Sequence, residues 1–177
     1  MKTSQFDFEK LSGADIVYDF CKLAKTHKYK IFFLGGKNEN NAIAVKIIRE
    51  KYDVAIDGYS PAFEDYPFSV HFNNSCLEKI AAFEPDILFV GFGSPKQEYW
   101  IDENISFLSK IGVKYAVGCG GTFDFISQKI KRASIFIQKM GMEGLYRLFR
   151  EPSKMRWKRL FESFIFFKYI WRKPDFK

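Results

Sequence analysis

Cysteine and histidine are scarce in this sequence, which excludes the commonest disulfide frameworks and structural metal sites. The chain has two isolated histidines, His27 and His71, and three widely spaced cysteines, Cys21, Cys76 and Cys119, with no C-x-x-C pair. An odd number of scattered cysteines gives no disulfide framework, and their spacing gives no zinc site. We therefore expect buried free thiols in a reducing compartment.

Long apolar runs are missing as well. No stretch reaches the roughly 18–20 apolar residues that a membrane-spanning helix needs, and the start, MKTSQFDFEK, lacks the apolar core of a secretory signal. The GxGxxG motif of dinucleotide-binding proteins and the P-loop motif do not occur either, which argues against both functions. The sequence thus predicts a cytoplasmic protein, either soluble or bound at a membrane surface.

Most of the chain has no excess of charge of either sign. The net charge is +7, yet residues 147–177 alone hold ten basic and three acidic side chains, so this last stretch carries the whole excess. We expect a local surface for anions there, which the overall charge by itself does not reveal.

What the sequence does contain is an alternation of short strand-like runs and longer helical patterns. Strands are expected at Lys30–Leu34, Val54–Ile56, Asp86–Gly91 and Val113–Val117, and helices at Gly13–His27, Asn38–Tyr52, Asn73–Phe83 and from Pro95 to Lys110. This order predicts an α/β fold with a Rossmann-like parallel sheet flanked by helices. Strand signals stop near Ser127, so we expect residues 1–140 to form the α/β domain and residues 141–177 a helical appendage.

Glycines follow three of the predicted strands, at Gly35-Gly36, at Gly91-Phe92-Gly93 and at Gly118-Cys119-Gly120-Gly121. In open parallel sheets, ligands bind beyond the carboxyl ends of the strands. Glycine lets backbone N–H groups approach a phosphate, and the start of the next helix adds a favourable dipole. Tight turning from strand to helix explains any one of these turns, but three at one edge favour a phosphate-binding site.

Polar side chains begin the helix that follows the second glycine turn. Pro95 places Lys96, Gln97 and Glu98 in the first helical turn, at the predicted ligand edge. Lys96 can neutralise a phosphate, and Gln97 can both donate and accept hydrogen bonds. Glu98 taken alone reads as an acidic residue that complements the helix dipole.

The third glycine turn leads into another polar helix start. Thr122 is a candidate helix cap, and Asp124 can accept hydrogen bonds from ribose or sugar hydroxyls. A simple capped helix start explains the same residues equally well.

The two polar helix starts belong to an ordered set of motifs. GSPKQE (Gly93–Glu98) and GGTFDF (Gly120–Phe125) are the most distinctive of them. KLSGAD (Lys10–Asp15), FLGG (Phe33–Gly36), SQKIKRAS (Ser127–Ser134) and MEGLYRLFREPSK (Met142–Lys154) lie around them. Together they resemble the WecG/TagA/CpsF glycosyltransferases over nearly the whole chain from residue 9.

The resemblance implies transfer of an N-acetylhexosamine, often N-acetylmannosamine, from a UDP-sugar to a polyprenyl-diphosphate-linked sugar, with inversion at the anomeric carbon. Such enzymes serve cell-surface polysaccharides of the teichoic acid, capsule or enterobacterial-antigen type. No D-x-D triplet occurs, so we expect no metal and no cofactor. Glycine turns, helix starts and basic side chains would then meet the phosphate charge.

Members of this family carry a further sheet-forming region before the point where this chain begins, including an Asp in a D-G turn proposed as the base. Asp57-Gly58 is also a D-G pair, but it does not align with that turn. The candidates for catalysis in this chain are therefore Gln97 and Arg147. An incompetent fragment, a homo-oligomer or a subunit complemented by an N-terminal partner remain alternatives.

The basic tail has an aromatic face, with Trp157, Leu160, Phe161, Phe164 and Ile165 at helical spacing. A basic amphipathic helix rich in Trp and Phe suits the surface of an anionic membrane, here the inner face of the cytoplasmic membrane. A terminal helix packed on the domain is the alternative.

By the resemblance, basic residues of the tail reach a lipid diphosphate or the membrane. The candidates for this contact are Arg147, Lys154, Arg156 and Arg159, with Trp157 beside them. The same basic, aromatic composition also suits a nucleic-acid-binding module, but that reading leaves Gly93–Glu98 and Gly120–Phe125 without a role, so we expect no nucleic-acid partner.

Overall fold

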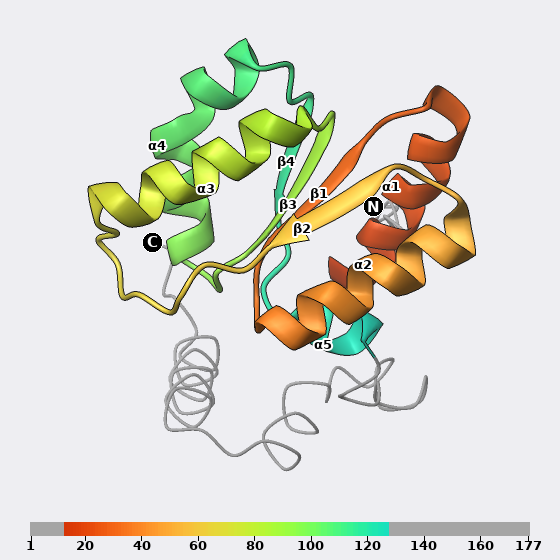
Figure 1. The fold of residues 1–177 in the computed structure, drawn as a ribbon, viewed down its shortest axis with the longest axis horizontal. Helices are drawn as coiled ribbons and strands as arrows, with labels where there is room; N and C mark the ends of the chain where they lie inside the picture. Colours follow the sequence, from red (N-terminus) through yellow and green to blue (C-terminus); the bar gives the residue numbers. More distant parts are fainter. Residues whose placement is uncertain (1–12, 128–177) are drawn as a thin grey trace, which may run out of the picture. The chain divides into compact units, whose positions relative to one another are not determined.

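The computed structural model describes residues 13–127, which form a four-stranded parallel sheet with helices on both faces (Figure 1). The strands are β1 (Ile31–Gly35), β2 (Ile56–Tyr59), β3 (Ile87–Gly91) and β4 (Tyr115–Gly118), and they lie in the order β2-β1-β3-β4. The helices are α1 (Gly13–His27), α2 (Asn38–Tyr52), α3 (Val70–Phe83), α4 (Lys96–Lys110) and α5 (Thr122–Ile126). The predicted Rossmann-like α/β fold is confirmed.

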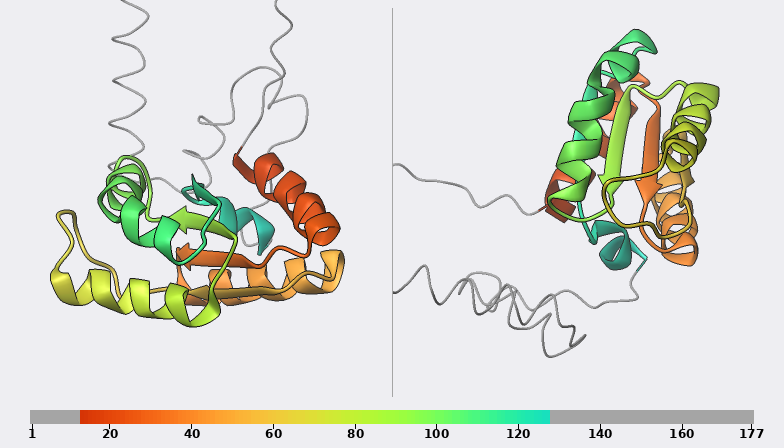
Figure 2. Two further views of the ribbon diagram at one scale, coloured as in Figure 1. Left: turned by 90° about the horizontal axis from the view of Figure 1, so that it is seen from above. Right: turned by 90° about the vertical axis from the view of Figure 1, so that its left-hand side faces the viewer.

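The two central strands have apolar side chains on both faces, which is why their sequences read as continuous apolar runs. Ile31 and Phe33 of β1 pack into one core with α1, α2 and α5. Phe32 and Leu34 face the opposite core, which α3 and α4 cover. Figures 1 and 2 show these two groups of helices on opposite sides of the strands.

The second strand and the third helix begin elsewhere than predicted. β2 runs over Ile56–Tyr59, not Val54–Ile56, because Asp57 and Gly58 continue the parallel pairing opposite Phe32 and Phe33. The D-G pair is therefore strand and not turn. α3 begins at Val70, three residues before the expected start, because the Ser69 side chain accepts a hydrogen bond from the Phe72 N–H and caps the helix.

The fourth strand also starts later than predicted. Val113 lies in the turn that follows α4, where its N–H donates to the carbonyl of Leu108 at 3.0 Å. Lys114 bonds to Asp86, the residue before β3: its N–H donates to the Asp86 carbonyl and its Nζ pairs with Oδ1, at 2.8 Å each. Pairing of β4 with β3 begins only at Tyr115, opposite Ile87.

The cysteines have the buried, unpaired character expected from their spacing. Cys21 and Cys76 are fully buried free thiols, and Cys119 is half-buried. Burial raises the pKa of Cys21 and of Cys76 to about 12, so both thiols stay protonated at neutral pH. They fill the two cores and supply no nucleophile.

Several predictions about the C-terminal part fall outside the described residues. They concern the appendage at 141–177, its boundary at residue 140, and the side chains Arg147, Lys154, Arg156, Trp157 and Arg159. Within residues 13–127, no helix has the length and apolar character needed to cross a membrane.

Candidate functional site

The order of the strands reverses between β1 and β3. From β1 the chain first moves outward to β2, then returns to place β3 on the other side of β1 and β4 beyond it. Ligands of open α/β sheets bind outside the carboxyl ends of the strands at such a reversal. Here those ends are Gly35 and Gly91, which are paired in register, and the Gly36 N–H donates to the Gly91 carbonyl at 3.2 Å.

The phenyl ring of Phe123 fills the space beneath these glycines. Phe123 is 1% exposed and stacks on Phe33 with ring centroids 4.6 Å apart. A Cβ on Gly36 would lie 2.9 Å from this ring, and one on Gly91 would lie 2.8 Å from it. Gly36 also has φ +72°, a conformation that other residues rarely adopt. Close packing against α5 therefore requires glycine at both positions.

Gln97 joins the two other glycine turns. Its side chain is 4% exposed, and its Oε1 accepts from the Gly93 N–H at 3.2 Å and from the Gly120 N–H at 2.9 Å. A Cβ on Gly118 would lie 2.6 Å from Nε2 of Gln97, so glycine there makes room for this amide. The turns after β3 and β4 are thus held together by one side chain, and the two predicted polar helix starts do lie at one rim.

These contacts change the expected role of the glycines. The N–H groups of Gly36, Gly93 and Gly120 already have acceptors within the chain, so they are not open donors for a phosphate as the sequence suggested. Gln97 likewise uses its oxygen on the backbone and donates from Nε2 to Oε1 of Glu98 at 2.9 Å. The buried Gln97 amide connects loops; it does not project into an open cleft.

The first turn of α2 also lies at this edge. It follows β1 directly through Gly36 and Lys37, and the N-cap residue Lys37 offers no side-chain hydrogen bond to the helix. The first-turn N–H groups of a helix have no partner within the helix, and the helix dipole favours an anion there. Because α2 has 15 residues and begins at the strand reversal, this start is a geometrically suitable phosphate site.

Lys96, Thr122 and Gly121 have local roles in the structure. Nζ of Lys96 pairs with Asp65 at 2.5 Å and lies 5.0 Å from the ring centre of Phe63, so it must leave these partners to reach a phosphate. Thr122 is the first residue of α5 and not its cap; the N-cap is Gly121. The Thr122 hydroxyl donates to the Cys119 carbonyl at 2.6 Å.

A residue that the sequence analysis missed lies beside Asp124. Nδ2 of Asn40, in the first turn of α2, donates to Oδ1 of Asp124 in α5. Asn40 is 2% exposed, and its Oδ1 is buried without a hydrogen-bond partner. An unpaired buried acceptor costs about 1–3 kcal/mol. The available signal was a polar pair, Asn40 and Asn41, that opens a helix directly after a glycine turn.

Asn41 fixes the geometry of the same edge. It is also 2% exposed, and its Nδ2 donates to the carbonyls of Phe33, at 3.0 Å, and of Gly35, at 2.8 Å. The Gly35 carbonyl takes a second bond from the Ser60 hydroxyl at 2.9 Å. These bonds anchor the first turn of α2 to the end of β1.

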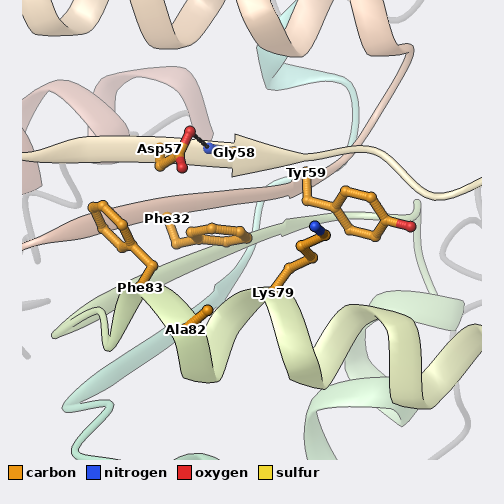
Figure 3. Close-up of a pocket in the computed structure, with 7 residues that line it drawn as sticks. All are labelled: Phe32, Asp57, Gly58, Tyr59, Lys79, Ala82 and Phe83. Atoms are coloured by element: carbon orange, nitrogen blue, oxygen red, sulfur yellow. Dashed lines mark hydrogen bonds between the residues drawn. The ribbon is translucent and has the colours of Figure 1, made fainter.

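A pocket of about 240 Å³ lies away from this edge, between β2 and α3 (Figure 3). It is lined by Phe32, Asp57, Gly58, Tyr59, Lys79, Ala82 and Phe83, none of which the sequence analysis named as a site residue. In the part of the chain that the structure describes, no group of three potential metal-ligating His, Cys, Asp or Glu side chains occurs.

The sequence of this chain matches a known protein family. Residues 4–176 match the model of the family described as "Glycosyl transferase WecG/TagA/CpsF family". Three curated relatives share the name N-acetylglucosaminyldiphosphoundecaprenol N-acetyl-beta-D-mannosaminyltransferase. The proteins of Bacillus spizizenii, Bacillus subtilis and Staphylococcus aureus are 33%, 30% and 26% identical to this chain over 154, 152 and 151 residues.

Each of these matches covers 85% of this chain, but only 55%, 55% and 54% of the three relatives. The chain therefore spans about half the length of the curated relatives that it matches.

Proposed function

The chain belongs to the WecG/TagA/CpsF glycosyltransferase family, and on this premise we propose that it binds a UDP-sugar for transfer of N-acetylmannosamine to a polyprenyl-diphosphate-linked acceptor. The acceptor named for the relatives is N-acetylglucosaminyldiphosphoundecaprenol. The product would enter a cell-surface polysaccharide. Because the matched segment is only about 55% of each relative's length, the activity, substrates and partners of the whole protein are part of the proposal.

One observation carries the proposal: the start of α2 and the Asn40–Asp124 pair lie together at the strand reversal. The helix start offers N–H donors to a diphosphate, and the pair offers oxygen acceptors to hydroxyl groups. A sugar nucleotide carries both groups in one molecule: a diphosphate that accepts hydrogen bonds and hydroxyl groups that donate them. The proposal thus assigns the phosphates to the backbone N–H groups of Asn38 and Asn40 and the hydroxyls to the neighbouring side chains.

In the proposed reaction, the acceptor hydroxyl oxygen forms a bond to the anomeric carbon while the bond from that carbon to the UDP oxygen breaks. UDP leaves with the electron pair, and the hydroxyl proton passes to a base. The helix start would stabilise the negative charge that grows on the departing diphosphate. We assign no base among residues 13–127, and no step requires a metal or cofactor.

We further propose that the protein works at the inner face of the cytoplasmic membrane, where a polyprenyl-linked acceptor is held. The basic tail from Arg147 onward would contact the lipid diphosphate and the anionic surface. Assembly into a homo-oligomer, or with a complementing N-terminal subunit, is part of the proposal. The family match reaches residue 176 and so includes this tail, which leaves the nucleic-acid alternative without an observation of its own.

Calorimetry with UDP, uridine and UDP-N-acetylmannosamine tests the binding half of this proposal. We expect UDP and the sugar nucleotide to bind with dissociation constants in the micromolar to millimolar range, on the order of typical substrate affinities. Uridine should bind at least about tenfold more weakly, because it lacks the diphosphate that meets the helix start. Equal affinity for uridine and UDP, or no binding of either, would contradict the proposal.

UDP release in the presence of the sugar nucleotide and a lipid-linked N-acetylglucosamine acceptor tests the transfer half. Release that depends on the acceptor supports a complete catalytic site in this chain. Binding of UDP without any release would overturn catalysis by this chain alone while leaving the nucleotide site in place.

A further inference from the structure

The amide of Asn40 has a fixed orientation in the structure. An ionised carboxylate only accepts hydrogen bonds, so the amide must turn its NH₂ group toward Asp124, as the Nδ2 to Oδ1 contact shows. The group left without a partner is therefore the carbonyl oxygen Oδ1, which can only accept. Since nearly all buried polar groups in native proteins are paired, this oxygen calls for a donor that residues 13–127 do not supply.

Asp124 adds a second acceptor beside it. Asp124 is half-buried at the start of α5, and Asn40 donates a hydrogen bond only to its Oδ1. Within the described residues, Oδ2 of Asp124 receives no hydrogen bond from the chain; the Asp124 backbone carbonyl takes the remaining contact, from Ser127. A buried acceptor without a partner and a half-buried carboxylate oxygen thus occur on one hydrogen-bonded pair, where α5 packs against the start of α2 (Figure 1).

We infer that Asn40 and Asp124 together form a subsite that recognises hydroxyl groups of the sugar nucleotide, with Oδ1 of Asn40 and Oδ2 of Asp124 as the acceptors. Adjacent hydroxyls, such as those of a ribose or a hexosamine, supply two O–H donors side by side. The inference rests on the proposed function, and it adds Asn40 as a ligand-contacting residue. In this account, the hydrogen bond between the two side chains holds both oxygens in place before the ligand arrives.

Affinities of the chain for UDP, 2′-deoxy-UDP and UDP-N-acetylmannosamine, measured by calorimetry, test this subsite. If the ribose supplies the donors, the wild-type protein binds UDP about three- to tenfold more tightly than 2′-deoxy-UDP, the ratio expected for one net hydrogen bond. In Asn40→Ala and in Asp124→Asn this ratio falls toward one. If the hexosamine supplies them, the same variants instead lose the preference for UDP-N-acetylmannosamine over UDP.

The variants separate this role from general damage to the fold. Asn74→Ala is the matched control, because Asn74 is an exposed asparagine on α3. This variant should keep the wild-type ratios of affinity between the ligands. Asn40→Ala removes an unpaired buried oxygen as well as one hydrogen bond, so its Tm should stay close to that of the wild type. Equal weakening of all three ligands in Asn40→Ala, or no weakening at all, would overturn the subsite. Failure of the wild-type protein to bind UDP would instead overturn the proposed function.

Discussion

Replacing Phe123 with alanine is expected to lower the free energy of unfolding by about 3–5 kcal/mol, the usual cost of removing a buried phenyl ring. Phe123 is 1% exposed, stacks on Phe33 and touches the backbone at Gly36 and Gly91. These glycines have no side chain with which to close the gap. The cavity would therefore open directly beneath the carboxyl ends of β1 and β3, and nucleotide binding should weaken together with stability.

Urea unfolding of the variant and of the wild-type protein measures this effect. Phe63→Ala is the matched control, because Phe63 is 87% exposed and its truncation should change the free energy of unfolding by no more than about 0.5 kcal/mol. A loss of less than about 1 kcal/mol in Phe123→Ala would show that α5 does not support the edge of the sheet.

The second large effect is expected from Gln97→Met, which keeps the size of the side chain but removes its acceptor. The half-buried Gly93 and Gly120 N–H groups would both lose their partner, at a cost of about 1 kcal/mol for each hydrogen bond. The turns after β3 and β4 would no longer be tied to each other. We expect UDP affinity to fall at least about tenfold, since loops that are not held in place must be ordered on binding.

Gln97→Glu provides the conservative comparison for this prediction. A glutamate keeps an oxygen that can accept from both glycines, but it loses the donor to Glu98 and sets two carboxylates side by side. Its stability and UDP affinity should therefore lie between those of the wild type and Gln97→Met. Wild-type values in Gln97→Met, measured by calorimetry and by thermal unfolding, would remove Gln97 from this role.

The overall fold follows from local patterns because its central strands are buried on both faces. Ile31–Gly35 and Ile87–Gly91 read as uninterrupted apolar runs, and α1 and α2 have the predicted bounds. The edge strand β2 was harder to place, since its position depends on pairing with β1. Gly58 lies where a Cβ would meet Oδ1 of Asn41 at 2.2 Å, and this packing is not visible in the local sequence.

Burial along a helix depends on contacts that the local sequence does not show. In α2, Ala42 is exposed, whereas Ala44 is buried. The buried stripe instead begins with two asparagines, Asn40 and Asn41, whose burial depends on hydrogen bonds to Asp124 and to the carbonyls of β1. A count of apolar residues gives no weight to polar side chains that are buried because they are paired.

The sequence predicts which turns lie at one edge of the sheet, but not what their residues contact. Three glycine turns and two polar helix starts do meet at one edge, as the parallel sheet requires. A glycine that is needed for close packing and a glycine that contacts a phosphate look the same in a sequence. In the structure, close packing against Phe123 accounts for Gly36 and Gly91, and a positive φ accounts for Gly93 and Gly120.

A crystal structure of this chain with bound UDP tests the phosphate site at the start of α2 most directly. We expect the diphosphate at the first turn of α2, between the carboxyl ends of β1 and β3, with the backbone N–H groups of Asn38 and Asn40 as donors. UDP found instead in the pocket between β2 and α3, beside Lys79 and Phe83, would contradict the account.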